Sequence, residues 1–365
     1  MGFTLSTNIK NSPTKDFQYI VTANARRVLG SLIADYSSGI HSFTMIGTYG
    51  TGKSSFIMAL ERDLLFSTDV LCKNSGQFNH YTKFRCINIV GDYTTLSNLL
   101  CEELNVDKGI GTKEIFSRLD STIEACKKKK EFVLIVVDEF GKVLEHATNN
   151  NPEKELYFLQ QFAEYINRPN HDNVLFLSTL HQNFGAYARK LTEQQFNEWI
   201  KVKGRFKELV FSEPVEQLLH LAAEHISNIK QTVQSKGAFD RLFALAKSTK
   251  FIGIDFPEEV AKKLYPLDMF AAVALTQAIQ RYGQNERSLF SFLMSQGDNS
   301  IQNFKATATK TYSLANVYDY IVYNFNSYLS EVNADSANWT AMRVALERTE
   351  SVFDIEEIND ACKLV

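Results

Sequence analysis

The chain has 365 residues, of which 44% are hydrophobic and 22% are charged, and its formal net charge is −3. This length exceeds one comfortable hydrophobic core, so we expect two or three domains in an ordinary soluble globular protein. The small negative charge argues against a protein that coats nucleic acid through bulk electrostatics, although it leaves a local basic face open.

The composition also disfavours membrane and secreted proteins. No run approaches the roughly eighteen apolar residues that a membrane-spanning helix needs, and the N-terminus lacks the apolar core of a secretory signal. The five cysteines are scattered and include no C-x-x-C pair. Such a set is typical of reduced thiols, so we expect a cytoplasmic protein that makes no membrane contact.

The first part of the chain leads into a glycine-rich loop. Residues 1–15 are polar and are expected to form a loose arm, 16–36 carry apolar residues at helical spacing, and 43–46 are apolar as in a strand. The stretch GTYGTGKSS at 47–55 then matches the phosphate-binding pattern G-x-x-x-x-G-K-[ST], and 56–65 continue with helical spacing.

This loop predicts a binding site for the phosphates of a nucleotide. Its glycines let backbone N–H groups point inward, and the start of the following helix adds a positive field. Lys53 is expected to reach the β- and γ-phosphates and the Ser54 hydroxyl to hold Mg²⁺, so we expect ATP and Mg²⁺ as ligands. The alternative is a glycine-rich turn that binds nothing. The expected binding residues of the loop are Gly47, Thr48, Tyr49, Gly50, Thr51, Gly52, Lys53, Ser54 and Ser55.

Strands and helices alternate from this loop up to residue 213. The alternation predicts an α/β fold of three layers, in which a parallel sheet lies between helices. Residues 132–137 are all apolar and mostly β-branched, as expected for a strand that is covered on both faces. Further strands are expected at 84–91, 173–180 and 207–213, and further helices at 94–104, 153–167 and 184–200.

Two carboxylates follow the apolar strand at 132–137. Asp138 matches the Walker B aspartate, which orients a water in the Mg²⁺ shell, so it is the second expected metal residue beside Ser54. Glu139 is placed to polarise the attacking water as a general base. The alternative is that the two side chains only solvate the end of a strand.

The pattern changes at Pro214, after which it is helical with almost no strand signal. We expect a P-loop NTPase core at 1–213, an all-helical lid at 214–297 and a further helical segment at 298–365. The last residues have the pattern of an amphipathic helix without a capping signal, which suggests a truncated chain or one region of a longer protein.

The strand at 84–91 and the glutamate directly after Asp138 resemble the additional-strand, catalytic-glutamate branch of P-loop NTPases. Within this branch, residues 16 to about 295 resemble the AAA+ and STAND ATPases. The resemblance implies that the helices after the sheet form a lid over the nucleotide.

Three further positions follow from this resemblance. The sensor 1 residue, a polar side chain at the end of the strand after Walker B, is expected to be Thr179, with Ser178 and His181 as substitutes. Arg205 lies where AAA+ proteins carry an arginine finger, which implies contact with the γ-phosphate of a neighbouring subunit in a homo-oligomer. Arg287 resembles the sensor 2 arginine of a replication-initiator-type lid. The alternatives are an ordinary strand-end hydroxyl and surface arginines.

The stretches NERSLFSFL and VVDEFGK together also resemble the large ATP-binding proteins of bacterial antiviral defence systems. The sequence therefore favours an ATPase that couples its nucleotide state to conformational change and assembly. It leaves open what the motion acts on, since DNA remodelling, activation of an effector protein and gating of a partner protein all fit. A nucleotide-loaded scaffold that hydrolyses ATP negligibly and recruits protein or DNA partners is the alternative. The basic run at 127–130 is interpreted as a solvated helix end, and contact with DNA or RNA remains open.

Overall fold

The computed structural model describes most of residues 8–353 and divides the chain into two compact units, 1–213 and 214–365. Within 8–353, it does not describe residues 12, 18, 49, 74–76, 79–80, 212–214, 227–235, 254–255, 283–285, 298, 308–309 and 331–335, nor the side chains of 216–217, 236, 238, 286–287, 327–328 and 330.

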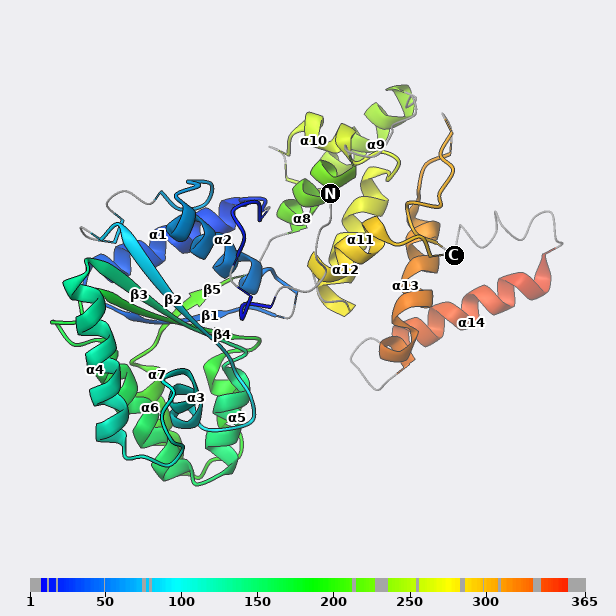
Figure 1. Cartoon of the computed structure of the whole chain (residues 1–365). Helices are drawn as coiled ribbons and strands as arrows, with labels where there is room; N and C mark the ends of the chain where they lie inside the picture. The colour runs from blue at the N-terminus through cyan, green and yellow to red at the C-terminus, as the bar shows by residue number, and fades with distance from the viewer. Residues whose placement is uncertain are drawn as a thin grey trace. The chain divides into compact units, whose positions relative to one another are not determined.

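A five-stranded parallel sheet forms the centre of the first unit (Figure 1). The strands lie in the order β2-β3-β4-β1-β5, so β1 has a neighbour on each side and β5 lies at one edge. This arrangement confirms the α/β fold with a parallel sheet. The strands are β1 (Ser42–Ile46), β2 (Lys83–Val90), β3 (Glu131–Asp138), β4 (Val174–Leu180) and β5 (Lys207–Val210).

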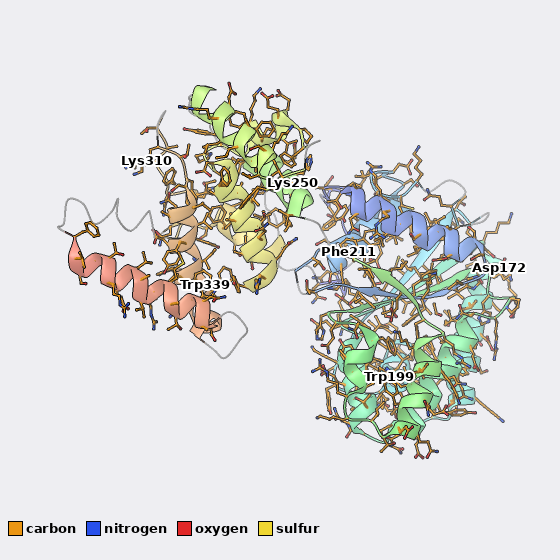
Figure 2. All side chains as sticks on the ribbon, turned by 180° about the vertical axis from the view of Figure 1, so that it is seen from behind. Asp172, Trp199, Phe211, Lys250, Lys310 and Trp339 are labelled. Carbon is orange, nitrogen blue, oxygen red and sulfur yellow. The ribbon has the colours of Figure 1, made fainter. Side chains whose placement is uncertain are left out.

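Helices cover both faces of this sheet and complete the three layers (Figure 1). The helices α1 (Ala23–Ser37) and α2 (Lys53–Phe66) pack on one face, in a core that includes Phe43, Phe56 and Phe211. Five α-helices and the 3-10 helix η1 pack on the other face, where Trp199 is buried (Figure 2). These are α3 (Leu96–Glu103), α4 (Thr112–Lys128), α5 (Gly141–Asn149), α6 (Pro152–Ile166), η1 (Phe184–Ala188) and α7 (Glu193–Lys203).

Local capping explains where several helices differ from the sequence expectation. The helix expected from residue 16 begins at Ala23, because the Thr22 hydroxyl accepts a hydrogen bond from the N–H of Ala25. The helix expected at 184–200 is split into η1 and α7, and a capping box at Thr192 starts α7. The sequence analysis gave no range for α4 or α5, although it interpreted the run at 127–130 as the end of a helix.

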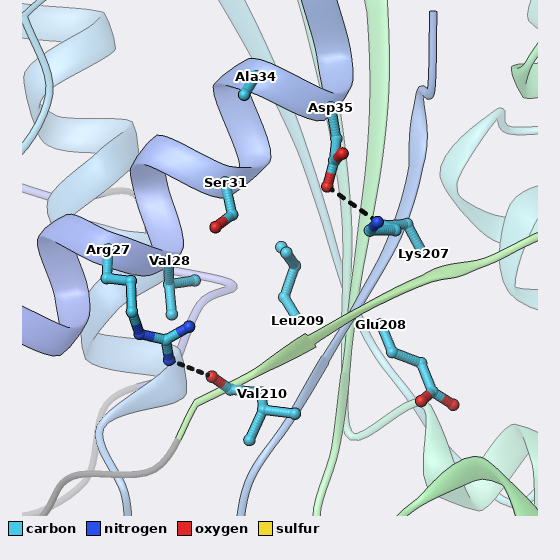
Figure 3. A pocket seen from close by; sticks show the side chains of 9 residues that line it. All are labelled: Arg27, Val28, Ser31, Ala34, Asp35, Lys207, Glu208, Leu209 and Val210. Carbon is cyan, nitrogen blue, oxygen red and sulfur yellow. Dashed lines mark hydrogen bonds and ion pairs between the residues drawn. The ribbon is translucent and has the colours of Figure 1, made fainter. Parts of the chain in front are cut away.

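A groove of about 450 Å³ runs between α1 and the edge strand β5 (Figure 3). Polar contacts lie along it: the Arg27 guanidinium donates to the Val210 carbonyl over 3.1 Å, and Lys207 lies 3.4 Å from Asp35. Val210 itself is 57% exposed. These contacts cover part of the open side of β5, which blunts an edge that would otherwise pair with another chain.

The second unit is helical throughout its named elements. In it, α8 packs against α10, α11 and α12, and α11 packs against α13. Tyr312 also exchanges backbone hydrogen bonds with the segment before α11, at Pro266 and Asp268. The residues after 297 therefore belong to the same compact unit as the helices before them, whereas the sequence analysis separates the two. The helices are α8 (Val215–Ile226), α9 (Lys236–Ser248), α10 (Glu258–Lys263), α11 (Met269–Tyr282), α12 (Glu286–Met294), α13 (Leu314–Ser330) and α14 (Ser336–Val352).

Among the described residues, no helix combines the length and the apolar character needed to cross a membrane.

Two buried histidines lie at the amino-terminal edge of the sheet. His41, just before β1, is 6% exposed, and His171, before β4, is 2% exposed. Burial lowers the pKa of both imidazoles below the ordinary value of 6.5, although Asp172 raises the pKa of His41 and Asp120 that of His171. Both are therefore neutral in the folded protein at neutral pH.

We expect His41 and His171 to make the folded state less stable as the pH falls below about 6.5, because the unfolded chain takes up protons on these imidazoles before the folded chain does. Each imidazole contributes a slope of at most about 1.4 kcal/mol per pH unit. Urea unfolding between pH 7.5 and 5.5 measures this slope, and the double variant His41→Gln, His171→Gln should flatten it. The control His220→Gln removes an imidazole from the second unit. An equal slope in the double variant and in the unmodified protein would contradict the assignment.

Candidate functional site

The glycine-rich loop lies at the carboxyl end of β1, directly before α2. Gly50 has φ +70° and Gly52 has φ +84°, a left-handed backbone that L side chains rarely adopt. The backbone conformation of the loop therefore requires glycine at both positions. Tyr49 lies outside the described residues.

The first glycine of the loop is needed for a different reason, which is a close backbone approach. A Cβ atom on Gly47 would lie 2.1 Å from the carbonyl oxygen of Phe211, and the N–H of Phe211 donates to Ile46 over 2.7 Å. The chain after β5 thus presses against the base of the loop, and only a residue without a side chain fits there.

Lys53 is buried in the loop with 9% of its surface exposed. Its ammonium donates to the carbonyl oxygens of Gly47 and Thr48 over 2.5 and 2.8 Å, while the Thr51 hydroxyl also donates to Thr48. The charge is thus held by the loop's own carbonyl groups, which are exchangeable for the oxygens of a phosphate. Because Lys53 is also the first residue of α2, the positive end of this helix faces the same place.

A chain of short contacts connects α2 to the ends of β3 and β4. The Ser54 hydroxyl donates to Oδ2 of Asp138 over 2.8 Å, and the Thr179 hydroxyl donates to Oδ1 over 2.5 Å. Asp138 is 8% exposed and Thr179 is 2% exposed, so the bond between them is shielded from water, whereas the bond from Ser54 is partly buried. A hydroxyl and a carboxylate oxygen so close together are the ligand types that Mg²⁺ prefers, so Ser54 and Asp138 fit the expected metal site.

The backbone turns sharply at Glu139, which follows Asp138. Glu139 has φ +56°, and its N–H contacts the Thr179 hydroxyl at 3.0 Å and Oδ1 of Asp138 at 3.1 Å. A Cβ atom on Gly91 would lie 2.4 Å from the Glu139 carbonyl oxygen. The left-handed backbone is therefore supported by two hydrogen bonds and by a glycine after β2. The sequence analysis missed this role of Gly91, although its place at the end of a strand was the available signal.

The Glu139 carboxylate forms an ion pair with Lys142, one turn later in α5. The two charged groups lie 2.6 Å apart, and about half of each side chain is exposed. The sequence analysis did not include Lys142 in the site, although it lies only three residues after Glu139, at the start of α5.

His181 follows β4 and lies near the charges of the site. Its pKa is lowered, first by burial and also by the charge of Lys53, while Glu145 and Glu139 act in the opposite direction. The hydroxyl of Tyr187 lies 3.2 Å from its Nδ1 atom. A Cβ atom at Gly141 would lie 2.4 Å from that hydroxyl, so a glycine at the start of α5 makes room for the tyrosine.

Thr179 and Ser178, the other two candidates for the sensor 1 residue, occupy different places from His181. Thr179 contacts Asp138, as described above, while Ser178 lies within the sheet and contacts Thr44 of β1 over 2.9 Å. Thr179 is thus in contact with the carboxylate, His181 is near the lysine of the loop, and Ser178 has a structural role between two strands.

The two expected arginines are not part of this cluster. Arg205 lies before β5, at the amino-terminal edge of the sheet, where the Ser42 hydroxyl donates to its carbonyl oxygen over 2.7 Å. The loop lies at the opposite end of β1, so Arg205 is not brought to it. Arg287 lies in α12 of the second unit, and its side chain is outside the described residues.

The described groups define a phosphate-binding core of the P-loop NTPase type. The loop offers a buried ammonium and the start of a helix, Ser54 and Asp138 offer ligands for a hard cation, and Glu139 offers a carboxylate next to them. Such a site is suited to binding a nucleotide phosphate chain with its metal ion.

No protein-family model matches the chain, and neither does any curated protein. Solved structures give weak similarities. Caenorhabditis elegans PCH-2 is 14% identical with a TM-score of 0.40, over 87% of this chain and 72% of that chain. The Aeropyrum pernix ORC2 protein, in ADPNP–ADP complexes, is 12% identical with a TM-score of 0.39, over 80% and 75%. Cdc6p from Pyrobaculum aerophilum is 14% identical with a TM-score of 0.34, over 76% and 82%. The argument for function therefore rests on the residues of the site.

We expect Thr179→Val to destabilise the protein by about 1–3 kcal/mol, because the buried Asp138 carboxylate loses a hydrogen-bond donor. Thr179→Ser should restore most of this loss. Thr148→Val is a matched control, since the buried Thr148 hydroxyl donates within its own helix, to Leu144 and Glu145. Chemical denaturation measures the three variants. Equal losses in the two valine variants would contradict a special role for the Thr179 hydroxyl.

Proposed function

We propose that this chain is an ATP-binding and ATP-hydrolysing module of the AAA+/STAND type. The observation that carries the proposal is the contact of Ser54 and Thr179 with the two oxygens of Asp138, beside the buried Lys53 and next to Glu139. An isolated glycine-rich turn has no need of this arrangement. The residue types in this cluster and their positions are those required to bind phosphate, to bind a metal ion and to activate a water molecule.

In the proposed reaction, water attacks the γ-phosphate in line with the bond to the leaving ADP. Lys53 would exchange its carbonyl partners for phosphate oxygens, and Ser54 and Asp138 would hold Mg²⁺. A bound Mg²⁺ ion supplies positive charge to the phosphate oxygens. Glu139 accepts a proton from the attacking water, for which its carboxylate must leave Lys142. Loss of the phosphate contacts then changes the conformation of the module.

We also propose a homo-oligomer in which Arg205 acts on a neighbour's nucleotide. This role requires Arg205 to lie far from the phosphate-binding loop of its own subunit, as it does. A planar guanidinium is suited to binding phosphate oxygens. Arg287 of the proposed lid would contact the nucleotide of its own subunit. The conformational change would act on a partner effector protein, and the resemblance of NERSLFSFL and VVDEFGK favours a role in antiviral defence.

The ion pair between Glu139 and Lys142 favours a second candidate function. While its carboxylate is held 2.6 Å from the Lys142 ammonium, Glu139 is engaged by this partner and must leave it before it can accept a proton from a water molecule. A module locked in this state would bind ATP, hydrolyse it negligibly and serve as a nucleotide-loaded scaffold for protein or DNA partners.

Lys53→Ala should weaken the binding of ATP·Mg²⁺ at least tenfold, because the ammonium that faces the phosphates is lost. Isothermal titration calorimetry measures the dissociation constant. Lys129→Ala, which removes an exposed lysine at the end of α4, is the control and should leave the constant unchanged. An unchanged constant in Lys53→Ala would sink the assignment of the loop.

Glu139→Gln should separate nucleotide binding from turnover. The amide keeps the shape of the side chain but cannot accept a proton, so ATP should stay bound while hydrolysis falls about a hundredfold or more. Release of phosphate under steady-state conditions measures the rate. A parental rate in the variant would exclude Glu139 as the base, and absence of turnover in the parent, with and without DNA, would favour the scaffold.

A further inference from the structure

The guanidinium of Arg205 is held by one acidic side chain of α6. Its Nε and Nη2 atoms lie 2.8 and 2.6 Å from the same carboxylate oxygen of Glu164, and Nη1 donates to the carbonyl oxygen of Lys201 over 2.7 Å. The amide of Gln160 also donates to that oxygen of Glu164. All three nitrogens of the guanidinium are therefore engaged within the subunit.

This ion pair cannot exchange with a phosphate in the subunit's own site. The carbonyl of Arg205 is bonded to Ser42, the first residue of β1, and the phosphate-binding loop begins after Ile46, the last one. Five strand residues separate the two ends by roughly 15 Å. Any phosphate that replaces Glu164 must come from outside the subunit.

The groups around the guanidinium are accessible to such a ligand. Arg205 is 30% exposed and Glu164 is 50% exposed, so the pair lies at the surface and is screened by water. A phosphate group carries more negative charge than a carboxylate and accepts the same forked pair of N–H bonds. The contact is therefore strong enough to orient the arginine and weak enough to be displaced.

We propose that Glu164 is a latch on Arg205, which holds the guanidinium inside the free subunit until the nucleotide of a second copy of this chain replaces the carboxylate. The inference rests on the proposed trans role of Arg205. Every assembly step must then break the ion pair between Arg205 and Glu164. The latch raises the protein concentration that assembly requires and keeps separate subunits inactive.

The test compares the unmodified chain with Glu164→Gln, in which the charge is lost and the side-chain shape is kept. Specific ATPase activity and sedimentation with ATP·Mg²⁺ are measured against protein concentration. The half-maximal concentration should fall about threefold to fivefold, which is within the range that a surface ion pair supplies. Glu198→Gln is the matched control, because Glu198 forms an exposed ion pair with Lys201 on α7 and does not contact Arg205. It should produce no shift.

A second comparison separates a latch from a merely structural contact. If Glu164 only stabilised the packing of α6 against the segment after α7, Glu164→Gln would lower the unfolding temperature. It would also raise the protein concentration at which activity and association are half-maximal. On an Arg205→Ala background the shift caused by Glu164→Gln should vanish. An unchanged or higher half-maximal concentration in Glu164→Gln, or a shift that persists without Arg205, would overturn the proposal.

The sedimentation measurement tests the latch separately from ATP hydrolysis. Absence of phosphate release from the parent at every concentration counts against hydrolysis. In that case sedimentation with ATP·Mg²⁺ still tests the latch. Displacement of the Glu164 carboxylate shifts the protein concentration at which subunits associate, whether or not ATP is cleaved.

Discussion

The buried carboxylate of Asp138 is the contact on which the site depends. It lies at the end of β3, and its two oxygens bind side chains from two other elements, Ser54 of α2 and Thr179 of β4. Because a buried anion is stable only when its hydrogen bonds are satisfied, these three elements are fixed relative to one another. The start of α2, and with it Lys53, is thereby placed beside the carboxylates.

Close packing of the backbone supports this arrangement. At Gly47 the loop meets the chain after β5, and at Gly91 the chain after β2 meets the turn at Glu139. Both contacts leave no space for a Cβ atom. The left-handed backbone of Glu139 is a strained conformation worth about 1–3 kcal/mol, and the bonds from its N–H to Asp138 and Thr179 offset it. Glu139, the proposed base, is thus held in place by residues at the carboxyl ends of β2, β3 and β4.

The two edges of the sheet have different roles in the proposed function. The carboxyl edge holds the phosphate loop and the carboxylates, while the amino-terminal edge holds Arg205 and the buried His41 and His171. In the proposed head-to-tail assembly, the arginine at one edge would contact the phosphates of the nucleotide bound at the opposite edge of a second copy. In the structure, this arginine forms an ion pair with Glu164.

The sequence by itself determined the α/β fold, because buried parallel strands require uninterrupted apolar runs such as 132–137 and the phosphate loop requires its glycines. It also predicted Lys53, Ser54, Asp138 and Glu139 as site residues, because their spacing within two motifs is local. The tertiary structure alone decided what lies beside them. The ion pair between Arg205 and Glu164, and the close approach of Gly91 to Glu139, join residues 41 and 48 positions apart, and no local pattern reports such contacts. The parallel pairing of β5 with β1 placed Arg205, which precedes β5, and the loop, which follows β1, at opposite ends of β1.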